Sequence, residues 1–287
     1  MKLNTNHKIL IVGLGLLGGS YARALTKKGF TVTAITRSQS SIDYALDEGI
    51  IAGGSAFVDE ALIAEADLVV FALYPHVFIE WIRKNQKFFK PGAIITDVTG
   101  VKESIVGTIQ DMLRPDVEFI AAHPMAGREV YGVQNSDDSI FKGANYVVTP
   151  SEKNTHSAIE LCCDLGKTLG FAKISEISPK EHDKMIAFVS QLTHCIAISL
   201  MTCQKTERLE DFTGDSFRDL TRIARLNEDM WSELFLINKT ALLHQLTLFE
   251  RELNHLRCML EEDDAEGLKS IMRYSTARRA LFDKKTD

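Results

Sequence analysis

Short apolar runs alternate with helical patterns over the first 177 residues of the chain. Residues 8–12 (KILIV) form a β-branched run that stops at a glycine, which is typical of a buried parallel strand. Similar runs recur at 30–36, 67–73, 93–96, 117–122, 145–149 and 172–177. Helical patterns cover 17–28 and 157–169, and Gly170 is placed to end the second of these helices. Strands that alternate with helices predict one α/β domain over residues 1–177, a doubly wound parallel sheet covered on both faces.

The pattern changes at Ser178, where an N-cap serine, a proline and a glutamate three residues after the cap predict a helix start. A helical stripe follows from Met185 to Leu200, and a second long helix is predicted from Asn227 until the acidic residues 261–264 interrupt it. Residues 265–283 predict a last helix, and no strand is expected after residue 177. Residues 178–287 are therefore predicted to form an all-α domain. Its apolar stripes have little chain to cover them, so we expect a homodimer formed through these helices.

Composition narrows the class of protein. The 287 residues are 45% hydrophobic and 25% charged, with 33 Lys plus Arg against 39 Asp plus Glu, as in ordinary globular proteins. The net charge of −6 argues against binding to nucleic acid or to a membrane surface, and no apolar run approaches the roughly 18 residues of a membrane span. The five cysteines fit neither a disulfide framework nor a zinc site, so no metal is expected. Residues 1–24 resemble a signal peptide in outline, but the glycines in this stretch have a better explanation below, so we expect a cytoplasmic protein.

The first apolar run leads into Gly13-Leu-Gly15-Leu-Leu-Gly18, a G-x-G-x-x-G motif between a predicted strand and a predicted helix. In this context the motif predicts dinucleotide binding in a Rossmann-type domain. The first glycine allows a tight turn, the second lets the backbone approach a pyrophosphate, and the third lets helix pack on strand. The cofactor-binding residues expected from the loop and from the end of the 67–73 run are Gly13, Gly15, Leu16, Leu17, Gly18, Leu73 and Tyr74.

The end of the second predicted strand bears on which dinucleotide binds. An NAD site usually carries Asp or Glu there for the ribose 2′-hydroxyl, but this chain has Thr36-Arg37-Ser38 and no acid until Asp43. A guanidinium beside hydroxyl groups suits a 2′-phosphate. The sequence therefore favours NADP, with NAD as the alternative.

Candidate catalytic residues follow two other predicted strands. His123 comes at the carboxyl end of the 117–122 run, and Thr99 lies in Asp97-Val-Thr-Gly-Val-Lys102 after the 93–96 run, so both are expected at the ligand-binding edge of the sheet. Arg218, Arg222 and Arg225 are spaced to share one face of a helix, where a cationic cluster suits a carboxylate-rich ligand.

With these motifs, the sequence resembles the prephenate/arogenate dehydrogenase family of tyrosine biosynthesis over nearly its whole length. The resemblance rests on the glycine motif, D-x-x-x-V-K, HPMAG from His123, S-P-x-x-H-D from Ser178, and S-F-R-D-x-T-R-I-A before a helix that carries Trp231. It implies oxidative decarboxylation of prephenate or arogenate, with hydride passing to a nicotinamide.

The resemblance also implies roles for single residues. His123 would accept a hydrogen bond from the ring 4-hydroxyl and remove its proton, for which it must be neutral. Arg222 would hold the ring carboxylate and pair with Glu129 when no substrate is bound. The remaining residues expected at the substrate are Gln191, His194 and Arg225.

The chain departs from the family pattern at two positions. Many relatives have Ser where this chain has Gly100, so Thr99 is the candidate to supply the missing hydroxyl; relatives often have His where this chain has Gln191. The sequence also lacks the regulatory domain that some relatives carry, so tyrosine feedback through such a domain is not expected.

Three alternatives stay open on the sequence. The substrate is either prephenate or arogenate. The chain could instead be a β-hydroxyacid dehydrogenase or pyrroline-carboxylate reductase, for which Lys184 is available, or a non-catalytic nucleotide sensor.

Overall fold

The computed structural model describes residues 2–128 and 130–282. The chain forms two compact units, Met1–Lys239 and Thr240–Asp287. The first unit contains both sheets of the molecule and the helices up to α10.

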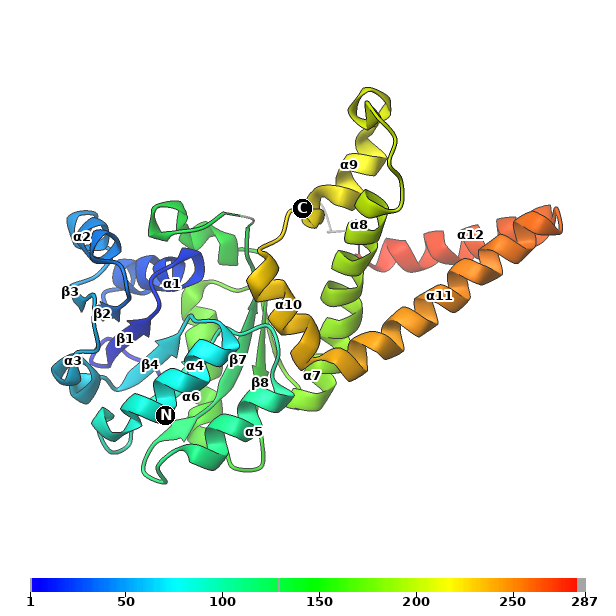
Figure 1. Ribbon diagram of the computed structural model, residues 1–287. Coiled ribbons are helices and arrows are strands. Elements are labelled where there is room, and N and C mark those ends of the chain that lie inside the picture. Colours follow the sequence, from blue (N-terminus) through cyan, green and yellow to red (C-terminus); the bar gives the residue numbers. More distant parts are fainter. Residues whose placement is uncertain (1, 129, 283–287) are drawn as a thin grey trace. The chain divides into compact units, whose positions relative to one another are not determined.

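The main sheet has six parallel strands in the order β3-β2-β1-β4-β5-β6, the Rossmann order that the glycine motif predicts (Figure 1). Its strands are β1 (Lys8–Val12), β2 (Thr31–Ile35), β3 (Gly53–Ser55), β4 (Leu68–Phe71), β5 (Ile94–Asp97) and β6 (Glu118–Phe119). Val12 at the end of β1 lies opposite Ile35 on one side and Phe71 on the other, so three strands end together. β3 was not predicted, because its sequence Gly-Gly-Ser contains no apolar run.

Both faces of this sheet are covered by helices, as predicted. Ile9 and Ile11 of β1 pack with residues of α1 (Leu16–Lys27) and α6 (His156–Leu169). Leu10 and Val12 pack on the opposite face with residues of α4 (Pro75–Asn85) and α5 (Glu103–Met112) (Figure 1). This burial on both sides explains why β1 is apolar at consecutive positions instead of alternating ones. The shorter helices α2 (Gln39–Asp47) and α3 (Glu60–Glu65) complete the order.

The last strands form a separate sheet, which corrects the expectation of one parallel sheet. β7 (Ala121–Met125), β8 (Asn145–Thr149) and β9 (Lys173–Glu176) make three strands, with β7 antiparallel to β8 and β8 parallel to β9. The predicted strand 117–122 is divided at Ile120, whose N–H still bonds to Ile95 of the first sheet. An apolar run does not encode which neighbour a strand pairs with, so the sequence pattern could not separate the two sheets.

Two of the remaining helices of the first unit begin where the sequence signals predict. α7 (Pro179–Ile186) opens with a complete capping box between Ser178 and Glu181 and continues through a π-helical turn (Ala187–Leu192) into α8 (Thr193–Thr202). After α9 (Asp215–Thr221), α10 (Glu228–Ile237) is capped by the Asn227 side chain, which accepts a 2.8 Å hydrogen bond from Met230 N.

The long helix predicted after Asn227 is two helices. Asn238 leaves the helical conformation and ends α10, and α11 (Lys239–Glu261) starts directly after it. The Asn238 side chain is buried and donates hydrogen bonds to Asp183 O at 2.9 Å and Gln191 Oε1 at 2.8 Å. These contacts come from distant parts of the chain, so the helical period alone did not predict the break.

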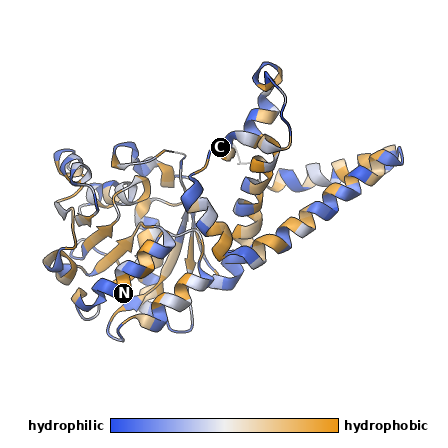
Figure 2. Cartoon of the chain, viewed as in Figure 1, coloured by the Kyte–Doolittle hydropathy of each residue, from blue (hydrophilic) through white to orange (hydrophobic). Residues whose placement is uncertain are grey.

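The second unit consists of most of α11, then α12 (Ala265–Arg279) and a short 3₁₀ turn (Ala280–Phe282). The acidic residues separate the helices as predicted, with Asp264 capping α12. Hydrophobic and hydrophilic residues alternate along both helices (Figure 2). The exposed large apolar side chains of this unit include Leu243, Leu248, Leu253, Leu260, Met272 and Tyr274.

One helical stretch, Pro179–Thr202, is long and apolar enough to cross a membrane by length and composition. It also carries His182, Asp183 and Gln191, which are buried in hydrogen bonds within the first unit. These contacts tie the stretch to the rest of the first unit, and 28% of its apolar window is buried.

Candidate functional site

A cavity of about 550 Å³ opens at the carboxyl edge of the main sheet, within the first unit. Its described walls come from the glycine loop, the β4–α4 turn, the end of β5, the β7 strand with the loop after it, the π-helical turn with α8, and α10. This is where an open parallel sheet binds its ligands. The lining residues that the sequence predicted are Gly15, Leu16, Leu17, Gly18, Leu73, Tyr74, Thr99, His123, Gln191, His194 and Arg225.

Each of the three glycines in the motif has a different structural role. Gly13 has φ +99°, and a Cβ there would collide with the Ala72 carbonyl. A Cβ at Gly18 would collide with the Gly13 carbonyl, so the third glycine permits close packing of α1 on the loop. At Gly15 a Cβ would meet no atom within 4 Å, and the residue lines the cavity. The loop therefore leaves open space directly before the amino end of α1, which has no acid in its first turn. This arrangement fits a pyrophosphate.

Thr36, Arg37 and Ser38 lie beyond the described cavity wall, at the end of β2. The Arg37 side chain is exposed, and the Ser38 hydroxyl lies within hydrogen-bond distance of the Ser40 and Ser41 hydroxyls, at 2.9 Å and 3.0 Å. Burial raises the pKa of Tyr74 in the cavity wall, and the charge of the Arg37 guanidinium opposes that rise.

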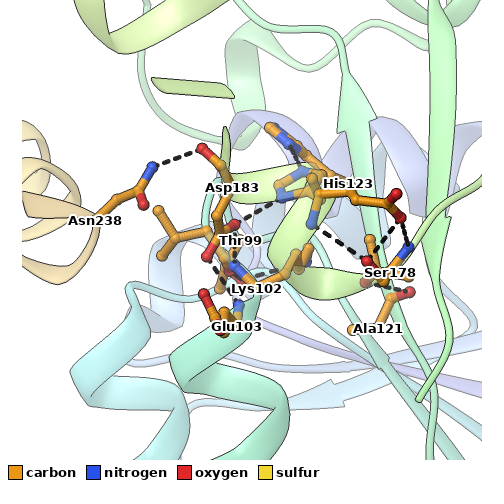
Figure 3. Close-up of polar contacts among 12 residues, drawn as sticks. Thr99, Lys102, Glu103, Ala121, His123, Ser178, Asp183 and Asn238 are labelled. Atoms are coloured by element: carbon orange, nitrogen blue, oxygen red, sulfur yellow. Dashed lines mark hydrogen bonds and ion pairs between the residues drawn. The ribbon is translucent and has the colours of Figure 1, made fainter. Parts of the chain in front are cut away.

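His123 on β7 is the candidate base, and a chain of hydrogen bonds links its ring to two residues of α7 (Figure 3). Its Nδ1 lies 2.9 Å from His182 Nε2, and His182 Nδ1 lies 2.8 Å from Asp183 Oδ1. Burial, the neighbouring His182 and the charge of Lys102 hold the pKa of His123 well below its usual value of 6.5. The pKa of His182 is also lowered, chiefly by burial, although Asp183 opposes this effect. His123 is therefore neutral at pH 7, as a general base must be.

Lys102 is fully buried, and its ammonium group contacts the backbone next to His123. Its ammonium donates to Asp97 Oδ2 at 2.7 Å and to Ala122 O at 2.6 Å, next to the base in sequence. Burial lowers the pKa of Lys102 and the Asp97 charge opposes the change. This ion pair fixes the end of β5 and the start of β7 relative to each other.

Thr99 lies in the cavity wall, but its hydroxyl is already engaged. It donates to the Asp97 carboxylate and receives a hydrogen bond from Lys102 Nζ at 3.3 Å. A role for this hydroxyl in place of the family serine remains a prediction. At Gly100 a Cβ would meet Leu234 at 3.6 Å and His123 Cε1 at 3.9 Å, which are ordinary contact distances.

Gln191 and His194 enter the cavity from the π-helical turn and α8. The Gln191 amide donates to Leu234 O at 3.0 Å and accepts from Asn238, which ties this turn to α10. His194 Nδ1 donates to Ser190 O at 2.8 Å, and its ring stacks on Trp231 with 3.7 Å between centroids. Both residues thus have structural contacts, and their contacts to substrate remain predictions.

The three arginines do not share one helical face, because α9 ends at Thr221. Arg222 begins a 3₁₀ turn and Arg225 has extended backbone. Arg225 lines the cavity, Arg222 is exposed and outside the described lining, and Arg218 bonds to Asp215 Oδ1 at 3.3 Å. Glu129 lies outside the described residues, so its pairing with Arg222 remains a prediction.

The sequence interpretation assigned no role to His182 and Asp183, although both belong to the S-P-x-x-H-D stretch that opens α7. The capping box fixes the start of this helix, and the spacing from Ser178 could have indicated that both residues lie in its first turns. Among residues 2–128 and 130–282, no cluster of three or more His, Cys, Asp or Glu is arranged to hold a metal ion.

Two family models match the chain in succession. Residues 21–175 match the nucleotide-binding domain of prephenate dehydrogenase, and residues 178–274 match its dimerisation domain. The chain belongs to the prephenate dehydrogenase family. It is therefore a nicotinamide-dependent dehydrogenase of the group that oxidatively decarboxylates prephenate or arogenate in tyrosine biosynthesis.

Similar proteins include the prephenate dehydrogenase of Bacillus subtilis, 30% identical over 269 residues, which are 91% of this chain and 72% of that protein. The cyclohexadienyl dehydrogenase of Zymomonas mobilis is 29% identical over 97% of this chain and 96% of its own length. The crystal structure of A. aeolicus prephenate dehydrogenase with hydroxyphenyl propionate and NAD+ superposes with a TM-score of 0.89 at 29% identity, over 99% of this chain and all of that one.

Proposed function

We propose that this enzyme oxidises prephenate, using His123 as the base and NADP as the hydride acceptor. The observation that carries the proposal is the His123 imidazole, whose pKa burial lowers, in the wall of the same cavity as the open glycine loop. A base and a dinucleotide site in one cavity are what removal of a proton and a hydride from one carbinol requires.

In the proposed reaction, His123 takes the proton of the ring 4-hydroxyl as the hydrogen on the same carbon departs as hydride. The ring carboxylate leaves as carbon dioxide, its bonding electrons complete the aromatic ring, and the ring oxygen regains the proton held by His123. A nicotinamide bound over the glycine loop would supply the hydride acceptor. Gly13, Gly15 and Gly18 with the amino end of α1 would hold the pyrophosphate.

Prephenate is favoured over arogenate by the charges of the cavity wall. The only formally charged side chains among its described lining residues are Arg128 and Arg225, and that lining contains no Asp or Glu. Two arginines suit the two carboxylates of prephenate, whereas none of the described lining residues offers a carboxylate to the ammonium group of arogenate.

Steady-state kinetics with both substrates test this choice. We expect kcat/KM for prephenate to exceed that for arogenate, and the reverse order would overturn the substrate assignment. A panel of β-hydroxyacids and proline serves as the control, because turnover of these compounds would support the other dehydrogenases with this architecture.

NADP is supported by Arg37 and the hydroxyls of Ser38, Ser40 and Ser41 at the end of β2, where no acid stands. We expect a lower KM for NADP than for NAD in the native enzyme. Arg37→Asp should reverse or abolish the preference, because a carboxylate repels the 2′-phosphate and accepts a hydrogen bond from a 2′-hydroxyl. Faster turnover with NAD at equal low concentration in the native enzyme would contradict the proposal.

The matched dimerisation domain supports a homodimer. We propose that the exposed apolar residues of α11 and α12, together with Met185, Phe188 and Val189, are covered by the second copy. Light scattering should give twice the chain mass of 32.1 kDa, and a stable monomer at micromolar concentration would exclude this arrangement. A cytoplasmic location remains a prediction.

A further inference from the structure

The buried pair His182 and Asp183 is joined to His123 by hydrogen bonds but lies outside the described cavity lining, and the proposed reaction does not use it. The three residues form one continuous chain of hydrogen bonds, His123 to His182 to Asp183, that starts in the cavity wall on β7 and ends on α7 (Figure 3). His182 is 1% exposed and Asp183 is 4% exposed, so this chain is shielded from water.

The direction of each hydrogen bond follows from the end of the chain. The Asp183 carboxylate accepts from two backbone N–H groups at the start of α5, with 2.8 Å from Lys102 N to Oδ1 and 2.8 Å from Glu103 N to Oδ2. An ionised carboxylate only accepts hydrogen bonds, so His182 Nδ1 must carry the proton that it shares with Asp183.

That assignment fixes the other ring. A neutral imidazole has one N–H, so His182 Nε2 is an acceptor and His123 Nδ1 is the donor in the 2.9 Å contact between them. His123 Nε2 is then the unprotonated nitrogen. It is the ring nitrogen that is left for a ligand in the cavity.

We propose that His182 and Asp183 are positioning residues that hold His123 in the tautomer with an unprotonated Nε2, ready to receive the substrate proton. The inference rests on the proposed function for its catalytic consequence, but the tautomer itself is a property of the resting protein. When His123 accepts the substrate proton, both of its ring nitrogens carry hydrogen. The positive charge then lies next to a chain that ends in a carboxylate, which stabilises it.

The test compares His182→Leu with His182→Gln. Leucine fills similar space without an acceptor, whereas the glutamine carbonyl can still accept the hydrogen bond from His123 Nδ1. In both variants the N–H groups of Lys102 and Glu103 can still donate to the Asp183 carboxylate. We expect His182→Leu to lower kcat by about 100-fold, the lower end of what general-base catalysis contributes, with KM changed little. His182→Gln should recover most of that loss. Equal kcat in the two variants, or a loss confined to KM, would overturn the proposal.

Nitrogen-15 NMR of the histidine rings reads the tautomer without any turnover, so it separates this inference from the proposed function. In the native enzyme the His123 Nε2 resonance should have the shift of an unprotonated nitrogen at pH 7. His182→Leu removes the acceptor of the His123 Nδ1 hydrogen bond and should move this resonance towards that of a protonated nitrogen, whereas His182→Gln keeps a carbonyl acceptor and should leave it close to native. An unchanged Nε2 resonance in folded His182→Leu, or a protonated Nε2 in the native enzyme, would refute the tautomer assignment.

Asn238→Ala is the matched control. It removes another buried polar contact to the same stretch of α7, at Asp183 O, but leaves the side-chain relay intact. We expect reduced thermal stability with an unchanged His123 tautomer. A tautomer shift in this variant equal to that in His182→Leu would show that any disturbance of α7 has the same effect, which contradicts a specific relay.

Discussion

The two ends of the proposed substrate site differ in how firmly the protein holds its polar groups. Around His123, four buried side chains (His182, Asp183, Lys102 and Asp97) have partners at 2.6 to 2.9 Å. The arginine segment consists of the short helix α9 and the 3₁₀ turn after it, and its Arg218, Arg222 and Arg225 are exposed.

This difference matches what each end must do. A base has to be kept in one tautomer and one position throughout the reaction, and buried hydrogen bonds do that. A carboxylate anchor must admit and release a charged substrate, and exposed guanidinium groups can do so without leaving a buried charge unpaired. Variants at the two ends should therefore change different kinetic constants.

The largest effect is expected at the base. His123→Asn should lower kcat by about 10²- to 10⁴-fold, because the substrate hydroxyl loses its proton acceptor. Binding of the dinucleotide, measured by calorimetry or fluorescence, should stay close to native, since the glycine loop is untouched. Near-native turnover would remove His123 from the mechanism.

Substitutions in the arginine segment should change KM for prephenate. Arg222→Ala is expected to raise KM for prephenate about 10- to 100-fold, the equivalent of one charge-assisted hydrogen bond of about 1.5–3 kcal/mol. Arg222→Lys should recover only part of this loss, because lysine cannot bond both oxygens of a carboxylate in a planar fork.

Arg225→Ala is the internal comparison for that prediction. Family resemblance favours Arg222 as the anchor, whereas Arg225 lines the cavity in this chain. We expect the Arg225 variant to be milder. An Arg222→Ala enzyme with native constants, beside an Arg225→Ala enzyme that does not saturate, would transfer the anchor role to Arg225.

The smallest effect is expected at Gly100, which lies beside His123 and Leu234 in the cavity wall. Gly100→Ser should fold normally, since the contacts available to a Cβ are ordinary and φ lies outside the left-handed region. The new hydroxyl should improve kcat/KM by about 2- to 10-fold, the value of one hydrogen bond to substrate. A tenfold loss of kcat/KM instead would show that the glycine itself is required. Gly100→Ala, which adds the Cβ without the hydroxyl, is the control.

Local signals in the sequence predicted the Rossmann sheet, the glycine loop and both helix starts at Ser178 and Asn227, because each depends on residues close together in the chain. The second sheet and the helix break at Asn238 depend on pairing between distant segments, and no periodicity encodes these contacts. The same limit applies to the site. His123 was found from its place after a strand, whereas the relay behind it exists only because α7 packs against β7 and the start of α5.

The pH dependence of kcat/KM for native enzyme and His123→Asn tests the account most directly. Burial, His182 and Lys102 lower the pKa of His123, whereas Asp183 and Asp97 act on its neighbour, where they oppose the lowering of the His182 pKa. Since the base must be unprotonated, the rate falls as the pH falls through this lowered pKa. The native profile should therefore still be on its plateau at pH 6.5, decline only well below that pH, and lose this acid limb in His123→Asn. An acid limb centred at or above pH 6.5, or one that persists unchanged in His123→Asn, would contradict the claim that a neutral His123 is the base.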